Sequence, residues 1–306
     1  MEQGVISLDS VGAFDLQSTV ESGQSYTWSR EDGRMYDQTH TYGGSAWYST
    51  VLPATMVGQP AVVRVRQRDG RLEWESTIDA HEPLVDLLRL DDNLDAIMDE
   101  TADEPLIREA YEAYRGLRLV RDPPFSSLVS FICSAQMRVS RIHEMQRSLA
   151  RAFGDPVEFD GQTYHAFPTP KQLATATEAE LRELKLGYRA PYVVATAEMV
   201  ANGELHPTDV IDMDYEQARE RLTEFVGVGQ KVADCVLLFS LDFLQAVPLD
   251  TWIRGAIADQ FPDCDRDSYT EMSRAIRERF GAEYAGYAQT YVFHYLREAE
   301  ETDVAA

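Results

Sequence analysis

The most informative stretch of the sequence reads LTEFVGVGQKVADC, residues 222–235. A helical pattern ends at Phe225, a Gly-Val-Gly turn follows, and a second helical pattern begins at Gln230. The glycines Gly227 and Gly229 allow a tight turn and let an anion approach exposed backbone N–H groups. Taken alone, the pattern indicates only two helices joined by a hairpin.

A lysine directly after this turn is unusual. The chain has only three lysines, and Lys231 lies in the first turn of the second helix. The positive end of the helix macrodipole makes this an unfavourable place for an ammonium group. A nucleophilic amine must be neutral to attack, so the same placement favours a catalytic role.

Nineteen residues after the lysine comes an aspartate, in the stretch QAVPLDTWIR, residues 245–254. Asp250 stands where the next helix is expected to begin, and capping that helix is the ordinary role of an aspartate there. A catalytic role is the alternative, and the distance of Asp250 from the Gly-Val-Gly-Gln-Lys turn favours that role.

These two segments resemble the helix-hairpin-helix (HhH-GPD) glycosylase superfamily of base-excision DNA repair, and within it the 8-oxoguanine DNA glycosylases. Four further blocks carry the resemblance along the chain: residues 22–28, 128–134, 186–190 and 284–293. The resemblance implies an α+β fold, in which an antiparallel β domain like that of TATA-binding protein precedes an all-helical body.

The resemblance also implies catalytic roles. Lys231 matches the nucleophile that attacks C1′ of a flipped nucleoside and forms a Schiff base, which permits strand cleavage by β-elimination. Asp250 matches the carboxylate that stabilises positive charge on the sugar. The hairpin residues Gly227, Val228 and Gly229 match a phosphate-binding turn.

Four residues match the family's recognition of the damaged base. The backbone carbonyl of Gly23 matches the acceptor for the N7–H of 8-oxoguanine, and Gln289 matches the group that binds the pairing edge. Phe293 and Cys235 match the groups that enclose the rings. Gln289 and Phe293 are four residues apart, so they share one helix face. Core packing is the ordinary reading of Phe293 and of Cys235.

Other residues match contacts to the opposite strand. Tyr188 and Arg189 match the segment that fills the gap left by the flipped base, and Arg141 matches a second contact to the opposite cytosine. Each exposed arginine is otherwise a solvated charge.

The sequence departs from the family at two points. Gln136 replaces an asparagine that reads the opposite cytosine, which puts the preference for cytosine in doubt. Trp252 replaces a phosphate-contacting histidine, which leaves Thr251 as the candidate for that contact.

The pattern of elements predicts a β-rich domain over residues 1–85, a helical domain over 86–300 and a disordered tail over 301–306. A hairpin is expected around Asp69-Gly70. One long buried helix is expected from Phe125 to Phe153, then a loop around Tyr164. Further helices are expected at 171–184, 190–203, 213–225, 230–241, 251–261 and 268–298.

The composition carries an unusual charge balance. There are 52 acidic and 28 basic residues, a net charge of −24, and few of the basic residues are lysines. This pattern is typical of proteins from salt-accumulating cytoplasms, where salt screens repulsion between carboxylates. The other reading is an ordinary acidic protein. Charge alone argues against a nucleic-acid partner, so a local basic strip has to overcome it.

The chain carries no apolar run long enough for a membrane helix and begins without a basic signal-peptide region. We therefore expect an intracellular protein, and the charge balance favours the cytoplasm of a prokaryote. We also expect a monomer associated with the nucleoid. The resemblance implies that its partner is double-stranded DNA with 8-oxoguanine opposite cytosine. Three widely spaced cysteines do not suffice for an iron–sulfur cluster. The resemblance implies no required cofactor and no side-chain metal site; carbonyls of Thr223, Phe225 and Val228 are weak candidates for a structural cation.

Two other functions stay open. A monofunctional alkyl-base (3-methyladenine) glycosylase of the same superfamily would keep the aspartate but lack the hairpin lysine. A non-catalytic DNA-binding hairpin module would need neither Asp250 nor a base pocket.

Overall fold

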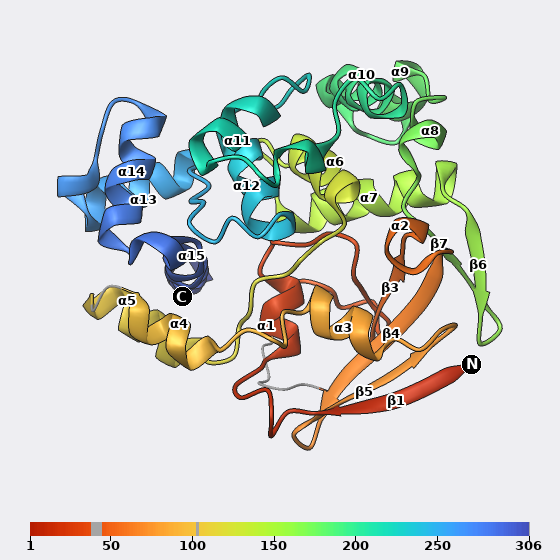
Figure 1. The fold of residues 1–306 in the computed structure, drawn as a ribbon, viewed down its shortest axis with the longest axis horizontal. Helices are drawn as coiled ribbons and strands as arrows, with labels where there is room; N and C mark the ends of the chain where they lie inside the picture. The colour runs from red at the N-terminus through yellow and green to blue at the C-terminus, as the bar shows by residue number, and fades with distance from the viewer. Residues whose placement is uncertain (38–44, 102–103, 306) are drawn as a thin grey trace.

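The computed structural model describes residues 1–37, 45–101 and 104–305. Strands dominate the first part of the chain, and helices dominate from Leu94 onward (Figure 1). This arrangement confirms the predicted α+β class.

The N-terminal part is built on a five-stranded antiparallel sheet. Its strands lie in the order β1 (Glu2–Ser7), β5 (Arg71–Ser76), β4 (Ala61–Arg68), β3 (Tyr48–Leu52) and β2 (Ser29–Arg30). The predicted hairpin joins β4 and β5, with Asp69 and Gly70 at φ of 48° and 71°. Positive φ at both turn residues matches the twist of the two strands. The short helices α1 (Leu16–Glu21), α2 (Ala54–Val57) and α3 (His81–Leu87) accompany the sheet.

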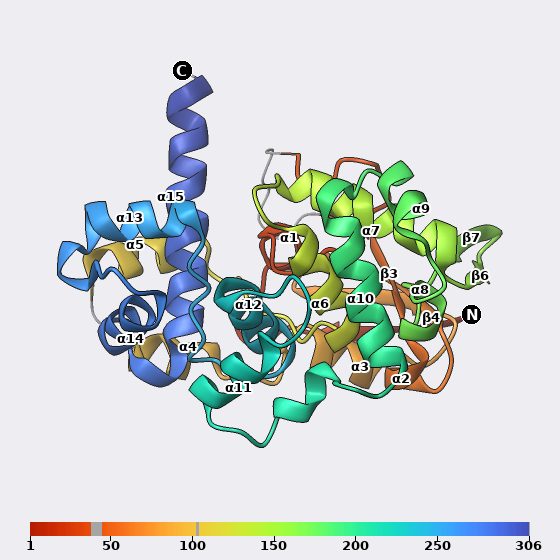
Figure 2. The same ribbon diagram turned by 90° about the horizontal axis from the view of Figure 1, so that it is seen from above.

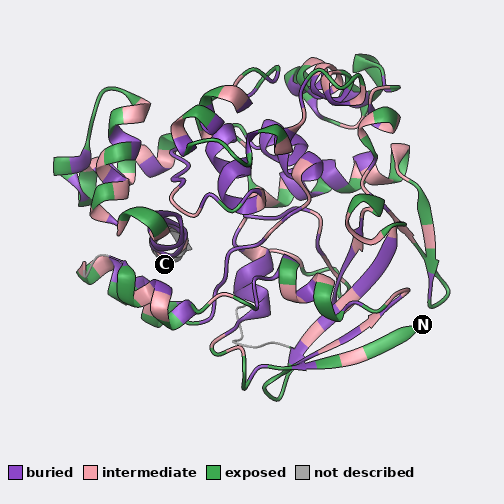
Figure 3. Cartoon of the chain, in the orientation of Figure 1, coloured by how far each residue is buried: buried purple, intermediate pink, exposed green. Residues whose placement is uncertain are grey.

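The helical part surrounds one buried helix. That helix is α12 (Gln230–Ser240), of which residues 232–239 are buried. Figures 1 and 2 show it between two groups of helices, and Figure 3 shows its burial. One group comprises α6 (Pro124–Cys133), α7 (Val139–Phe153), α8 (Pro170–Leu173), α9 (Glu178–Glu183), α10 (Ala190–Ala201) and α11 (Tyr215–Leu222). The other comprises α4 (Leu94–Glu100), α5 (Pro105–Ala113), α13 (Thr251–Gln260), α14 (Tyr269–Arg279) and α15 (Ala285–Ala305).

The prediction of a single helix from Phe125 to Phe153 is wrong. Helix α6 ends at Cys133 and α7 begins at Val139. Between them the Ser134 hydroxyl donates to the Phe131 carbonyl, and Gln136 adopts a φ of 51°. A left-handed residue cannot continue a right-handed helix, so the chain changes direction here.

Other elements also differ from the predicted ones. The expected loop around Tyr164 is a hairpin of β6 (Pro156–Phe159) and β7 (Gln162–His165), which turns at an Asp-Gly pair. The expected helix 268–298 is interrupted at Gly281, where φ is 88°. The expected helix 171–184 is two short helices, α8 and α9. Helix α15 extends to Ala305, through most of the predicted tail, and Ala306 lies outside the described residues.

Two hydrophobic clusters divide the buried residues. The first spans Ile6 to Leu90 and belongs to the sheet; the second comprises Tyr26 and residues from Leu94 to Phe293. Leu87 and Leu90 pack in the first cluster, beyond residue 85. The predicted boundary at residue 85 stays a prediction. Among the described residues, no helix has the length and apolar character needed to cross a membrane.

Candidate active site

The Gly-Val-Gly turn is held against α10 and remains open on its other side. Gly227 has a φ of 83°, and a Cβ there would lie 2.6 Å from the ring of Tyr192. Thr196 donates its hydroxyl to the carbonyl of Val226 at 3.1 Å. A Cβ added to Gly229, by contrast, would meet nothing within 4 Å. A phosphate therefore has access to the start of α12, where backbone N–H groups lack helical partners.

Lys231 extends from α12 toward the end of α6. Its Nζ donates to the Ser134 hydroxyl at 2.9 Å and lies 5.5 Å from the centroid of the Phe131 ring. The ring face attracts the ammonium group, and the hydroxyl fixes its direction. The half-buried amine is thus held by a segment almost a hundred residues earlier in the chain. Nothing local in the sequence signals the contact with Ser134.

Asp250 caps helix α13. Its backbone is extended, and its Oδ1 accepts from the backbone N–H of Ile253 at 2.8 Å. The capping interpretation is therefore correct as far as it goes. The bond engages Oδ1, so capping leaves the Oδ2 atom of this exposed residue for another partner.

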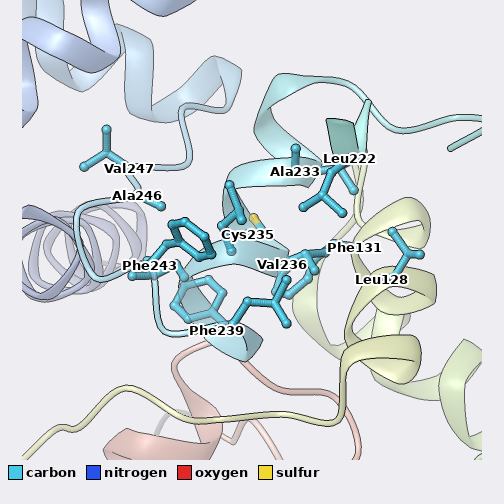
Figure 4. Close-up of a cluster of buried hydrophobic side chains, with 14 of the residues drawn as sticks. Leu128, Phe131, Leu222, Ala233, Cys235, Val236, Phe239, Phe243, Ala246 and Val247 are labelled. Carbon is cyan, nitrogen blue, oxygen red and sulfur yellow. The ribbon is translucent and has the colours of Figure 1, made fainter. Parts of the chain in front are cut away.

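The charges of the lysine and the aspartate both reach Cys235. Burial raises the pKa of the Cys235 thiol to about 11; Lys231 opposes the rise, and Asp234 and Asp250 add to it. Cys235 lies one turn after Lys231 on α12, and Figure 4 shows it among the buried side chains of that helix. The predicted nucleophile, carboxylate and pocket residue thus lie in one neighbourhood.

The predicted base-binding side chains are closed to solvent, and Cys235 and Phe293 belong to the same hydrophobic cluster. Cys235, Gln289 and Phe293 are all buried, and Phe293 meets Trp252 edge to face, with ring centroids 5.9 Å apart. The amide nitrogen of Gln289 donates to the carbonyl of Pro248 at 3.3 Å, while its Oε1 is buried without a partner. A buried orphan acceptor is costly, and the pairing edge of a guanine offers N–H donors. A base can enter only if these side chains separate.

Gly23 lies in a turn that contacts α7 and α15. It has a φ of 91°, and a Cβ there would lie 3.0 Å from Val139. Arg297 of α15 donates to the carbonyl of Ser22 at 2.9 Å, which ties the turn to the helix that carries Gln289. Tyr26 connects the turn to the lysine site, because its ring packs edge-on against Phe131 at 5.8 Å. The sequence interpretation gave Tyr26 no role of its own.

A buried aspartate joins the elements around the site. Asp234 accepts from the hydroxyls of Tyr215 at 2.8 Å and Tyr269 at 2.7 Å, and Arg219 lies 3.7 Å away. Burial raises the pKa of Asp234 to about 6, although Arg219 and both tyrosines favour the carboxylate. The Tyr269 hydroxyl also accepts from the backbone of Leu249, directly before the capping aspartate. This network positions the start of α13.

The predicted opposite-strand residues differ in exposure. Tyr188 is 56% exposed, whereas Arg189 is buried, donates to the carbonyl of Ala135 and lies 4.3 Å from the Tyr188 ring centroid. Gln136 is exposed. Arg141 is paired with Glu144, three residues later. Arg189 as placed supports the turn between α6 and α7, while Tyr188 projects from the surface.

The residues predicted to contact a phosphate and a cation lie in different surroundings. Thr251 is exposed at the first position of α13, beside Trp252, whose ring covers Phe293. The Phe225 carbonyl accepts from Val228 at 3.1 Å, which leaves one lone pair for a cation. In the described part of the chain, no group of three His, Cys, Asp or Glu side chains could hold a metal, and all three cysteines are unpaired.

Comparisons with known proteins agree with this geometry. A probable N-glycosylase/DNA lyase of Methanothermobacter thermautotrophicus is 31% identical, over 94% of this chain and 95% of that protein. The N-glycosylase/DNA lyase of Saccharomyces cerevisiae is 32% identical, over 78% of this chain and 66% of that protein. The structure of Clostridium acetobutylicum 8-oxoguanine glycosylase/lyase, in complex with double-stranded DNA containing cytosine opposite 8-oxoguanine, is 29% identical, with a TM-score of 0.80 over 94% of this chain and 93% of that chain.

A more distant structure shows that the fold is shared more widely. The 3-methyladenine DNA glycosylase of Archaeoglobus fulgidus is 21% identical, with a TM-score of 0.71 over 97% of this chain and 99% of that chain. Residues 7–128 match the N-terminal domain of 8-oxoguanine DNA glycosylase, and residues 129–282 match the HhH-GPD superfamily of base excision DNA repair proteins. The chain therefore belongs to the HhH-GPD superfamily, and its N-terminal domain is that of the 8-oxoguanine DNA glycosylases.

Proposed function

We propose that this chain is a bifunctional 8-oxoguanine DNA glycosylase and abasic-site lyase. The observation that carries the proposal is the placement of Lys231. Its amine is half-buried, directed by Ser134, and lies at the start of α12 beside an open glycine turn. Relatives named N-glycosylase/DNA lyase support the same activity.

The reaction follows from the groups at the site. The neutral amine of Lys231 attacks C1′ of the flipped nucleotide, and the bond from C1′ to the damaged base breaks. The lysine then forms a Schiff base with the opened sugar, which acidifies the C2′ proton and allows β-elimination of the 3′ phosphate. Asp250 stabilises the positive charge that develops on the sugar while the base leaves.

Recognition of the base uses the closed cluster. The carbonyl of Gly23 accepts from the N7–H that distinguishes 8-oxoguanine from guanine. Gln289 binds the pairing edge, and the orphan Oε1 of its side chain supports this assignment. Cys235 and Phe293 enclose the ring after they separate.

The DNA partner is bound through several further elements. We assign the phosphate on the lesion strand to the hairpin Gly227–Val228–Gly229 and to Thr251. Gln136, Arg141, Tyr188 and Arg189 face the opposite strand in this proposal, with cytosine as the opposite base. The structure of the Clostridium relative with such a duplex supports the pairing.

We propose that the protein acts as a monomer without an iron–sulfur cluster, in the high-salt cytoplasm of a prokaryote. The hairpin carbonyls of Thr223, Phe225 and Val228 are candidates for a structural monovalent or divalent cation. The net charge of −24 supports the high-salt environment.

Borohydride trapping tests the mechanism. Reduction during the reaction should crosslink the wild-type protein to DNA that contains 8-oxoguanine, and Lys231→Gln should abolish both the crosslink and strand cleavage. Lys171→Gln, which removes an exposed lysine of α8, is the matched control and should leave both intact. Undiminished trapping in Lys231→Gln would exclude this nucleophile.

The two roles of Asp250 can be separated. Asp250→Asn keeps an oxygen that can cap α13 but removes the charge. It should bind DNA normally and release the base on the order of 10²-fold more slowly. Equal rates of base release in the variant and wild type would support the capping role alone.

A further inference from the structure

A basic groove extends from Arg141, one of the residues predicted to contact the opposite strand. It has a volume of about 420 Å³ and runs between α7 and the segment 183–185. Four cationic and two acidic side chains line it: Arg141, Arg147, Arg151, Lys185, Glu144 and Glu183. We call it the α7 groove. A local excess of positive charge is unusual in a chain with a net charge of −24.

Within the described part of the chain, three of the four cations of the groove have no carboxylate partner, whereas several arginines elsewhere are held by two or more. Arg64 and Arg121, for example, each contact at least two carboxylates. Arg147, Arg151 and Lys185 are exposed, and among the described residues no carboxylate lies within 4 Å of their charged groups. Their charges are thus available to an external anion.

Two of these charges also repel each other. Arg147 and Arg151 are four residues apart on α7, so they occupy one face of the helix. Burial and the charge of Arg151 lower the pKa of Arg147, while Glu144 opposes this. A like-charge pair at this spacing destabilises a helix. An anion bound between the two guanidinium groups would remove this cost.

The groove continues the surface assigned to the opposite strand. Arg141 lies at its α7 end nearest the turn that holds Gln136, and Lys185 precedes Tyr188 by three residues. From Arg141 to Arg151 the helix advances about 15 Å. Phosphates of one strand advance about 3.4 Å each along the duplex axis, so a groove of this length can contact more than one of them.

We propose that the α7 groove binds the sugar-phosphate backbone of the undamaged strand, beyond the base opposite the lesion. Arg147, Arg151 and Lys185 contact its phosphates. This inference rests on the proposed function and extends it from the lesion strand to its complement. It also identifies where an acidic protein gains the electrostatic attraction that DNA binding requires.

Binding measurements with a matched control test the proposal. The variant Arg147→Gln/Arg151→Gln removes two groove charges, and Arg71→Gln/Arg115→Gln removes two exposed arginines elsewhere. The probe is a duplex with a tetrahydrofuran abasic analogue opposite cytosine, followed by fluorescence anisotropy across a KCl series. The groove variant should bind more weakly and lose about 1.8 from the slope of log K against log [salt], since each phosphate contact contributes about 0.9. The control should match wild type.

A shortened duplex identifies the strand. In this duplex the undamaged strand stops at the base opposite the lesion, so that no phosphates of that strand reach the groove. Wild type and groove variant should bind this duplex equally. Lys185→Gln, which leaves α7 intact, should lose about 0.9 of slope on the full duplex and nothing on the shortened one. Equal binding by groove variant and control, or an equal loss on both duplexes, would overturn the proposal. Failure of the proposed function has a different signature: wild type would bind the probe yet fail to excise 8-oxoguanine.

Discussion

Replacing Asp122 by asparagine should flatten the pH dependence of folding. Asp122 is 3% exposed, accepts from the hydroxyl of Ser25 at 2.8 Å, and lies at the joint between the Gly23 turn and α12. Its backbone N–H donates to Phe239, and its carbonyl accepts from Ser240. Burial raises the pKa of Asp122 to about 7, and only the bond from Ser25 opposes the rise.

The direction and magnitude of the change in unfolding free energy with pH follow from proton linkage. Between pH 4 and 7 the unfolded chain has released this proton and the folded protein has kept it, so stability falls as pH rises. The pKa difference from the ordinary value of 3.8 is about 3 units. At about 1.4 kcal/mol per unit, the wild type loses on the order of 4 kcal/mol of unfolding free energy across this window.

Urea unfolding, followed by tryptophan fluorescence in concentrated KCl, measures the effect. The stability difference between Asp122→Asn and wild type should shift in favour of the variant by roughly 1.4 kcal/mol per pH unit between pH 4 and 7. Ser25→Ala is the companion variant. It removes the only hydrogen bond that lowers the pKa of Asp122, so the fall in stability should extend to higher pH than in the wild type. Parallel pH profiles for Asp122→Asn and wild type would show that the carboxylate is charged throughout, and would refute the reasoning.

Three other outcomes are expected. Phe293→Ala should weaken excision of 8-oxoguanine and largely spare cleavage of a preformed abasic site, which has no base to enclose; equal loss on both substrates would identify Phe293 as core only. Gln136→Asn should raise the unfolding free energy by a few tenths to about 1 kcal/mol in urea titrations, because asparagine tolerates the left-handed φ of 51° better than glutamine. The same variant should increase selectivity for cytosine in excision assays against all four opposite bases. Circular dichroism and lesion cleavage across a KCl series should both rise into the molar range, whereas a protein folded at about 0.1 M salt that only loses activity above it would make the acidity incidental.

Local patterns in the sequence predicted much of the fold. The turns at Asp69-Gly70 and at Gly227–Gly229 were identified because their residues determine the backbone directly. The break at Gln136 was missed because glutamine is not a turn signal, and its left-handed φ depends on the packing of α6 and α7. The β6–β7 hairpin did carry a signal, the Asp160-Gly161 pair between alternating residues, and could have been found.

The groups at the candidate site could be named from sequence, but their supports could not. Lys231 is directed by Ser134, and the Gly23 turn by Arg297, through contacts that span 97 and 275 residues. The network of Asp234, which reaches Leu249 through Tyr269, likewise has no local pattern. Such contacts arise only when distant elements pack, so a motif indicates which group reacts and not what holds it.

Each support comes from a different element: Ser134 from the end of α6, Arg297 from α15, and Tyr269 from α14. The buried side chains of Cys235, Gln289 and Phe293 must be uncovered before a base can enter, either by rotation of a side chain or by movement of α15 relative to α12. Because Lys231 is anchored to α6 while Gln289 and Phe293 belong to α15, opening between the two groups of helices can admit the base without displacing the amine from Ser134. The arrangement therefore keeps the nucleophile oriented while the recognition side chains adjust.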